Sequence, residues 1–302
     1  MATRPAAAGA SPCEDGVIMF RDGLLADKVI VVTGGGTGLG RSMSKRFLEL
    51  GARVVIASRR RDVLEDAAAA LSAETGGEVL PWALDVRDPE GVTALFDAVE
   101  TRLGAIDALV NNAAGNFISP TERLSHRAFD AVLGIVLHGT VYCTLELGKR
   151  WIRQGRGGAV LSIATSYAES GSGYVVPSAV AKAGVVSLTR SLAGEWGKYG
   201  IRLNAIAPGP FPTEGAWSRL MPTPEIERLF RQRVPLGRVG RHEELADLAS
   251  YLLSDRAGFV SGDLIYIDGG EHAYGGGEFN VLDAVSQEAW DAMERHRKES
   301  GG

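Results

Sequence analysis

Three side chains in the middle of the chain could donate or orient a proton, those of Tyr167, Ser178 and Lys182. Ser178 and Lys182 stand four residues apart in a segment with a helical pattern, residues 177–199, so we expect them on one face of a helix. A phenol has an unperturbed pKa of about 10, which an adjacent lysine can lower. The aliphatic hydroxyl of Ser178 is a far weaker acid and a poor proton donor to an alkoxide. A site that takes its proton from Ser178 is therefore unsuited to ordinary ketone or alcohol chemistry.

A glycine-rich stretch near the start of the chain could bind a phosphate. It reads Thr33-Gly-Gly-Gly-Thr-Gly-Leu-Gly40, follows an apolar run and opens a segment of helical composition. In that placement, backbone N–H groups and the helix dipole can meet a pyrophosphate without obstruction by side chains. A glycine-rich turn without a ligand is the alternative, which the surrounding βαβ pattern disfavours. The residues predicted to bind a dinucleotide here are Gly34, Gly36, Thr37, Gly38 and Leu39.

Basic residues after the second apolar run indicate which dinucleotide the chain binds. An NAD-preferring site offers Asp or Glu to the ribose hydroxyls, but this chain has Ser58-Arg59-Arg60-Arg61. Because guanidinium groups suit a 2′-phosphate, we predict NADPH as the cofactor, with Ser58 and Arg59 as contacts. A solvated basic turn at the start of a helix is the alternative. Lys182 is predicted to contact the cofactor ribose, with a surface lysine as its alternative.

Further cofactor contacts are expected at the carboxyl ends of the third and fourth apolar runs. These are Asp85 and Val86 in the first case, and Asn112 and Ala113 in the second. The adenine and ribose of a dinucleotide would lie at this edge of the sheet. A helix N-cap is the alternative role for Asp85, although Asp88, which precedes a proline, is the better cap.

The sequence gives no sign of a metal site or of hydrolytic chemistry. The histidines are scattered and the two cysteines are far apart, so no cluster has the spacing of metal ligands. A G-x-S-x-G nucleophile elbow is also missing.

Composition limits the class of protein. The chain has 302 residues, 45% hydrophobic content and a net charge of -5, which suits one α/β domain and argues against a nucleic-acid-binding surface. Two cysteines, Cys13 and Cys143, favour a reducing compartment, and no apolar run approaches the length of a membrane span. Met1–Ala10 lacks the apolar stretch of a signal peptide. We therefore predict a cytoplasmic protein without membrane insertion; a mitochondrial or peroxisomal location is the alternative for a eukaryotic source.

Seven short apolar, β-branched runs must position these residues. Because they alternate with helical segments and are apolar on both faces, they predict a Rossmann-like, doubly wound parallel sheet in a three-layer αβα single domain. The predicted strands are Val29–Val32, Val54–Ile56, Val79–Leu80, Ala108–Val110, Val160–Ile163, Leu203–Ile206 and Leu264–Ile267.

The expected organisation along the chain has three parts. Residues 1–22 are predicted to form a flexible tail, 23–275 the dinucleotide-binding domain, and 276–302 an extension that packs on or near it. The loop 208–224 holds five prolines and two glycines, and we expect it to cover the substrate.

These features together resemble the short-chain dehydrogenase/reductase family over Lys28–Gly270. The resemblance is carried by the glycine-rich stretch, by Asn111–Gly115, Lys182, Pro208-Gly209 and Asp268-Gly-Gly270. The chain departs from the family pattern in one place. The family's catalytic tyrosine falls on Ser178, its helix asparagine on Val136 and its serine on Thr165, which indicates a different chemistry.

The finer resemblance is to 2,4-dienoyl-CoA reductases of the mitochondrial type. It is carried by Ala113–Ser125, Tyr167–Ser178, Pro208–Pro210 with Thr213–Gly215, and Gly277–Asn280. It implies Tyr167 as the acidic hydroxyl, assisted by Asn116, with Ser178 and Lys182 completing the catalytic group. It also implies further binding residues. Those for the cofactor are Pro208, Gly209, Pro210 and Phe211; those for the acyl-CoA substrate are Arg87, Phe117, Ser125 and Arg219, whose arginines suit phosphates.

The implied reaction delivers a hydride to C5 of the dienoyl thioester while negative charge collects on the thioester oxygen. Tyr167 and Asn116 would donate to that oxygen, Lys182 would hold the ribose, and Ser178 would bond Lys182 or the cofactor. An ordinary packed aromatic is the alternative for Tyr167. The resemblance also implies a homo-oligomer, by analogy a tetramer. Two other functions remain open: a carbonyl or 3-oxoacyl thioester reductase, and a non-catalytic NADPH-binding protein.

Overall fold

The chain folds around a single parallel sheet, as the alternating apolar runs predict. The computed structural model describes residues 20–213 and 223–300. The sheet has seven strands in the order β3-β2-β1-β4-β5-β6-β7, and every neighbouring pair is parallel. The strands are β1 (Val29–Thr33), β2 (Arg53–Ser58), β3 (Val79–Ala83), β4 (Ala108–Asn111), β5 (Gly158–Ile163), β6 (Ile201–Pro208) and β7 (Leu264–Ile267). The doubly wound α/β prediction is confirmed.

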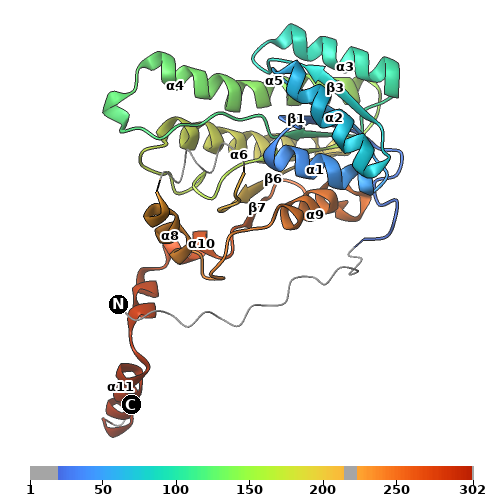
Figure 1. Cartoon of the computed structure of the whole chain (residues 1–302). Coiled ribbons are helices and arrows are strands. Elements are labelled where there is room, and N and C mark those ends of the chain that lie inside the picture. The colour runs from blue at the N-terminus through green and yellow to red at the C-terminus, as the bar shows by residue number, and fades with distance from the viewer. Residues whose placement is uncertain (1–19, 214–222, 301–302) are drawn as a thin grey trace.

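Helices cover both faces of this sheet (Figure 1). Helices α1, α2 and α9 share one apolar cluster with the sheet, and α3, α5 and α6 share the other. The helices are α1 (Gly38–Glu49), α2 (Arg61–Thr75), α3 (Pro89–Leu103), α4 (His126–Leu133), α5 (Gly139–Arg153), α6 (Val176–Trp196), α8 (Pro224–Gln232), α9 (His242–Leu253), α10 (Glu271–Gly276) and α11 (Gln287–Glu299).

The alternation of side chains along each strand divides the core between these two layers. In β1, Ile30 and Val32 belong to the cluster that contains Phe47 of α1, whereas Val29 and Val31 belong to the cluster on the opposite face. All the residues of β1 are buried. A strand that is apolar on both faces is stable only between two helical layers, which is why this sequence forms an αβα sandwich.

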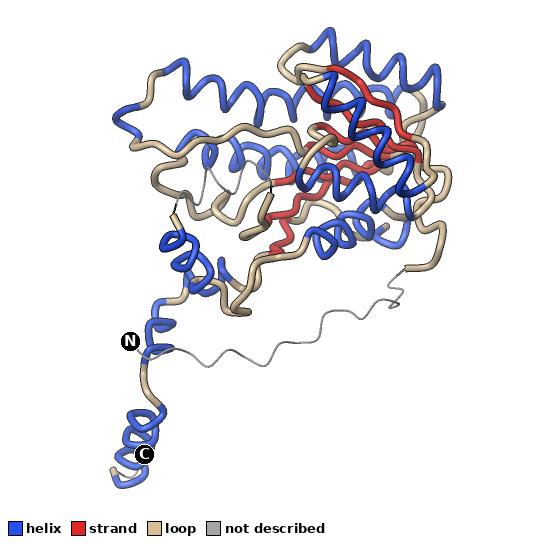
Figure 2. The backbone as a smooth tube through the Cα atoms, in the orientation of Figure 1, coloured by secondary structure: helices blue, strands red, loops and turns tan. Residues whose placement is uncertain are grey.

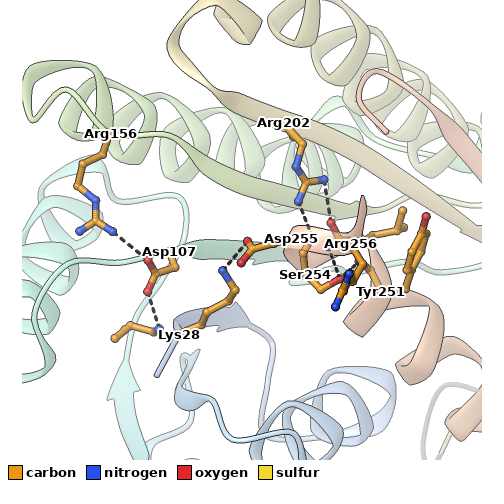
Figure 3. A network of polar contacts seen from close by, with 10 residues as sticks. Lys28, Asp107, Arg156, Arg202, Tyr251, Ser254, Asp255 and Arg256 are labelled. Carbon is orange, nitrogen blue, oxygen red and sulfur yellow. Dashed lines mark hydrogen bonds and ion pairs between the residues drawn. The ribbon is translucent and has the colours of Figure 1, made fainter. Parts of the chain in front are cut away.

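Polar contacts close the amino edge of the sheet (Figure 3). Asp107 accepts hydrogen bonds from the backbone N–H of Val29 and from Arg156, both at 2.9 Å. The Arg202 guanidinium donates to the carbonyl oxygens of Leu252, Ser254 and Val260 at 3.0, 3.1 and 3.3 Å. The Asp107 contacts join the starts of β1, β4 and β5, and the Arg202 contacts join the start of β6 to the end of α9 and to the segment before β7. Both groups lie far from the carboxyl ends of the strands, where the predicted site residues lie.

The helical stretch after β4 is not one regular α-helix. Helix α4 continues into α5 through a π-helical segment, η2 (Gly134–His138). By length and composition alone, the whole stretch could cross a membrane. Its α5 half, however, buries Leu147 and Trp151 against the sheet, as a core helix does. π-helical segments often occur at functional sites, and Ile135 of η2 lines the pocket described below.

The C-terminal extension leaves the domain (Figures 1 and 2). After α10 it forms a short 3₁₀ helix, η5 (Glu278–Ala284), and then α11, which has no buried residue. The expected packing of residues 276–302 on the domain is therefore not seen for α11. The physical reason is its composition, because a helix rich in charged side chains has little apolar surface to bury. The predicted tail, residues 1–22, lies almost wholly outside the described residues.

Candidate active site

The glycine-rich loop between β1 and α1 leaves a helix N-terminus open to an anion. Gly34 and Gly38 have φ values of 67° and 51°, a region that disfavours side chains with a Cβ. The N-cap of α1 is Thr37, whose side chain makes no capping hydrogen bond, and the first turn of α1 contains no acid. Its first N–H groups are therefore available to a phosphate.

Asn112 braces this loop. Its side-chain amide donates to the carbonyl oxygens of Thr33 and Gly34 at 3.0 and 3.2 Å. The Thr33 hydroxyl in turn accepts from the backbone N–H groups of Asn112 and Ala113, each at 3.0 Å. The Asn112 amide thus supports the glycine loop, and its predicted contact with a cofactor stays a prediction.

The loop forms one wall of an open pocket at the carboxyl edge of the sheet, with a volume of about 190 Å³. Half of the sixteen predicted cofactor contacts line it, together with six residues that were not predicted. The lining residues from the prediction are Gly34, Gly36, Thr37, Ser58, Arg59, Asp85, Val86 and Ala113; those missed are Ala57, Arg60, Val63, Leu84, Ala114 and Ile135.

Among the missed residues, Arg60 could have been found and Ile135 could not. Arg60 lines the pocket beside Arg59, and neither guanidinium makes a hydrogen bond or ion pair within the described part of the chain. Both are available to a phosphate. Ile135 reaches the pocket from the π-helical segment, and no pattern in the sequence predicts that segment.

The third strand ends in a tight ion pair at the pocket wall. The Asp85 carboxylate accepts from Arg87 Nε at 2.9 Å and from a terminal guanidinium nitrogen at 2.5 Å. The hydrogen bonds from Arg87 hold the pKa of Asp85 below its usual value. Asp88, and not Asp85, caps α3, since its side chain accepts from the N–H of Glu90. Arg87, predicted to bind the substrate, is therefore already paired in this structure.

The four predicted catalytic residues come from two loops and one helix. The loop that holds Asn116 is joined to the loop that holds Tyr167 by a backbone hydrogen bond from Ser119 N–H to Tyr174 O, at 2.9 Å. Ser178 and Lys182 lie one turn apart in α6 and are both buried. This backbone link brings Asn116 and Tyr167 together although 51 residues separate them.

The Tyr167 hydroxyl is the meeting point of this group. It lies 3.2 Å from Ser178 Oγ and 3.5 Å from Asn116 Nδ2. The Asn116 Oδ1 accepts from the N–H of Phe117 at 2.9 Å, which turns the NH₂ end of the amide toward Tyr167. Two N–H or O–H donors therefore converge on one small region, an arrangement suited to an oxygen that gains negative charge.

Lys182 has a separate anchor. Its Nζ donates to the carbonyl oxygen of Ile163 at the end of β5. Burial lowers its pKa to about 8. An ammonium has three N–H donors, so Lys182 keeps donors for a ribose. Ser178 was expected to bond Lys182 or the cofactor; within the described part of the chain its hydroxyl contacts Tyr167 and not Lys182, and the contact with a cofactor stays a prediction.

Two of the departures from the family pattern have a structural outcome. Val136 is buried in η2 and packs in one cluster with Ala181 of α6, and its carbonyl accepts from the Thr140 hydroxyl at 2.7 Å. The Thr165 hydroxyl is buried and has no hydrogen-bond partner among the residues that the structure describes. The polar groups that the family places near the catalytic tyrosine are thus replaced by an apolar contact and an unpaired hydroxyl.

The remaining predicted residues fall in different places. Ser125 is exposed and caps α4, since its hydroxyl accepts from the N–H of Ala128 at 3.2 Å. Phe117 is 38% exposed beside Asn116, where a side chain could meet a substrate. Arg219 lies outside the described residues. Ser125 therefore has a local structural role that the sequence did not predict.

The start of the predicted substrate loop lies against the glycine loop. A Cβ on Gly38 would come within 3.3 Å of the Thr213 side chain. Gly209 N–H donates to Ile267 O, and Pro210 O accepts from Gly240 N–H, both at 3.0 Å. Phe211 is buried in a core cluster, and the partly buried Leu39 packs against that cluster. The backbone bonds of Gly209 and Pro210 and the buried ring of Phe211 thus fix Pro208–Phe211 at the carboxyl edge of the sheet.

Known proteins similar to this chain share its whole domain. A family model described as enoyl-(acyl carrier protein) reductase matches residues 34–272. An uncharacterised oxidoreductase of Caenorhabditis elegans is 50% identical over 90% of this chain and 88% of its own length. A probable (3E)-enoyl-CoA-producing 2,4-dienoyl-CoA reductase of the same organism is 45% identical, over 91% of both chains. A probable (2E)-enoyl-CoA-producing 2,4-dienoyl-CoA reductase of Bacillus subtilis is 43% identical, over 81% of this chain and 96% of its own.

Solved structures agree with this assignment. A short chain dehydrogenase from Bacillus anthracis has 42% sequence identity and a TM-score of 0.74, over 82% of this chain and 97% of its own. A putative NAD(P)-dependent gluconate 5-dehydrogenase from Beutenbergia cavernae, solved with bound NADP, has 31% identity and a TM-score of 0.77, over 82% and 98% of the two chains. The predicted fold and the resemblance are both confirmed.

Proposed function

The chain belongs to the short-chain dehydrogenase/reductase family and is an oxidoreductase, and from this premise we propose that it uses NADPH to reduce 2,4-dienoyl-CoA thioesters to enoyl-CoA. The observation that carries the proposal is the convergence of Asn116 Nδ2 on the Tyr167 hydroxyl, which itself lies 3.2 Å from Ser178. Relatives named as 2,4-dienoyl-CoA reductases support the substrate class. A role in the β-oxidation of unsaturated fatty acids follows from that substrate.

The pocket fits a nicotinamide dinucleotide with a 2′-phosphate. The uncapped start of α1 would hold the pyrophosphate, and the unpaired Arg59 and Arg60 would hold the 2′-phosphate. Lys182 has donors left for the nicotinamide ribose. When bound, the cofactor supplies the hydride that reduces C5 of the substrate.

The residues of this chain would stabilise the charge that the reduction creates. The thioester oxygen becomes negative as a dienolate forms, and donors aimed at that oxygen lower the barrier. The Tyr167 O–H and the Asn116 NH₂ are the two donors that the loops bring together. Ser178 would accept from or donate to Tyr167, which holds the phenol ring in one orientation. Protonation at carbon would come from water.

The substrate class is tested by NADPH absorbance with 2,4-hexadienoyl-CoA and 2,4-decadienoyl-CoA. We expect turnover with NADPH and little with NADH, and little with acetoacetyl-CoA as a carbonyl control. Product analysis should show the trans-3-enoyl isomer; the relatives are named for both the 3E and the 2E product, so this must be measured. Inert behaviour toward both dienoyl thioesters would refute the proposal.

The cofactor preference is tested with Arg59→Ala. Loss of a guanidinium that meets a 2′-phosphate should raise KM for NADPH by about tenfold and leave KM for NADH nearly unchanged. Arg61→Ala is the matched control, since Arg61 is exposed in α2, pairs with Glu65 and does not line the pocket. Equal effects on both cofactors would argue against a 2′-phosphate contact.

We also infer that the protein works as a homo-oligomer, by family resemblance a tetramer. Only 33% of the most apolar window in His126–Arg153 is buried in the single chain, and Val180 of α6 is 48% exposed. Unburied apolar surface of this kind favours association. Light scattering after size-exclusion chromatography would give the mass of the oligomer.

The cytoplasmic location stays a prediction from the sequence, which cell fractionation would test.

A further inference from the structure

The loop that carries Tyr167 is held from the C-terminal side of the sheet. Glu169 stands two residues after Tyr167, and its Oε2 accepts a hydrogen bond from the Tyr266 hydroxyl at 2.6 Å. Its Oε1 accepts from Arg190 of α6 at 2.7 Å. Tyr266 belongs to β7, so a strand nearly 100 residues later in the chain reaches the loop between β5 and α6.

A second contact holds the other side of Tyr167. His272 Nδ1 lies 3.1 Å from the carbonyl oxygen of Ser166. Because a carbonyl only accepts, Nδ1 must carry the hydrogen. The N–H of His272 donates to Asp268 Oδ2 at 2.7 Å, which fixes the start of α10. The loop is therefore tied down at the residue before Tyr167 and at the second residue after it.

The two residues that make these contacts, Tyr266 and His272, also contact each other. The rings of Tyr266 and His272 stack with centroids 4.1 Å apart and planes 21° from parallel. The hydrogen bonds from Tyr266 and Arg190 lower the pKa of Glu169, while burial and the Glu169 carboxylate raise the pKa of Tyr266. At neutral pH a neutral phenol thus donates to a carboxylate, a charge-assisted hydrogen bond that is stronger than a neutral one.

The neighbouring Ala168 is buried in a small apolar cluster against which Tyr266 packs, and the other contacts are those of Tyr167 itself. Its own carbonyl accepts from Gly171 N–H within the same loop, and its hydroxyl contacts at 3.2 and 3.5 Å are long for O–H and N–H donors. The Glu169–Arg190 ion pair is exposed on both sides, and such pairs contribute little stability by themselves. Tyr266 and His272 are therefore the contacts with the geometry to hold the loop.

We propose that Tyr266 and His272 are positioning residues, which hold the loop 164–171 so that the Tyr167 hydroxyl faces Asn116. The proposal rests on the function inferred above for Tyr167, and it adds the residues that keep it in place. A displacement of about 1 Å at a reacting group can cost two orders of magnitude in rate, so a small shift of this loop should be visible in kcat.

The test is Tyr266→Phe, which removes one hydroxyl and keeps the ring that stacks on His272. We expect kcat with 2,4-hexadienoyl-CoA to fall about tenfold, with Kd for NADPH unchanged. Tyr274→Phe is the matched control, since its hydroxyl bonds Asn280 O in the C-terminal extension, away from the loop. Glu169→Gln, which keeps an acceptor for Tyr266, should lose less activity than Glu169→Leu.

A double-mutant cycle separates positioning from a general effect on the fold. If Tyr266 acts through Tyr167, then Tyr266→Phe should have almost no further effect on kcat in a Tyr167→Phe background. The same tenfold loss in both backgrounds, or no loss in the single variant, would overturn the proposal.

Hydrogen exchange gives a readout that does not depend on activity. Peptides that span residues 164–175 should exchange faster in Tyr266→Phe than in the wild type or in Tyr274→Phe. If the wild type fails to reduce dienoyl thioesters but this loop still loosens, the proposed function is wrong and the positioning role stands. If the wild type is active and neither exchange nor kcat changes, the positioning role is wrong.

Discussion

At the scale of single residues, the proposed function gives Tyr167 the role of acidic hydroxyl, to which Ser178 is unsuited. Ser178 is buried in α6 and bonds the phenol at 3.2 Å, so the aliphatic hydroxyl orients the acidic one. Tyr167 was expected as the acidic hydroxyl through family resemblance. The orientation of the Asn116 amide, fixed by Phe117 N–H, could not be predicted from sequence, because it depends on the path of a loop.

The buried Lys182 should give the reaction a characteristic pH dependence. Burial lowers its pKa to about 8, so the ammonium is present below that pH and is lost as the pH rises through it. Loss of the charge and of one N–H donor removes a contact to the ribose. We expect kcat/KM to fall above a pH of about 8 in steady-state assays, and Lys182→Arg to move this decline to higher pH. A profile that stays level across this range would contradict this role for Lys182.

At the scale of elements, the sequence predicted the strands, but it predicted the geometry of the site only in part. Apolar runs such as Val29–Val32 identified all seven strands, because a buried parallel strand must be apolar on both faces. The π-helical turn that brings Ile135 to the pocket left no sequence signal, since its composition is that of an ordinary helix. Ser125 and Asn112 were predicted as ligand contacts, and the sequence did not predict that their side chains also bond nearby backbone groups.

The brace between β4 and the glycine loop should be required for cofactor binding. Asn112→Ala leaves the carbonyl oxygens of Thr33 and Gly34 without their donor, at a cost of about 1–3 kcal/mol. We expect NADPH to bind about tenfold more weakly, as measured by fluorescence titration. Asn280→Ala removes a similar amide-to-carbonyl bond from the C-terminal extension and is the control. Unchanged Kd in Asn112→Ala would show that the loop is rigid without the brace.

At the scale of the whole molecule, the two edges of the sheet have different roles. The amino edge is cross-linked by Asp107 and Arg202 (Figure 3), while the carboxyl edge holds the pocket and the Tyr167 loop. Parallel α/β sheets bind ligands at their carboxyl edge, so this division follows from the topology. Stability and activity should therefore be separable by mutation.

Arg202→Ala should destabilise the protein without changing its activity at low temperature. Three carbonyl oxygens lose a charged donor, so we expect the free energy of unfolding to fall by about 2–3 kcal/mol in urea denaturation. Arg156→Ala removes a more exposed guanidinium from Asp107 and should cost less than about 1 kcal/mol. A similar loss in both variants, or a raised KM for NADPH in Arg202→Ala, would contradict the separation of the two edges.

The central claim is that Tyr167 donates to the oxygen that becomes negative during alkene reduction. Its most direct test is the rate of NADPH oxidation with 2,4-hexadienoyl-CoA by Tyr167→Phe beside the wild type. Removal of one such donor should lower kcat by about 100- to 1,000-fold, while Kd for NADPH stays the same. Turnover close to that of the wild type would show that another group carries this role.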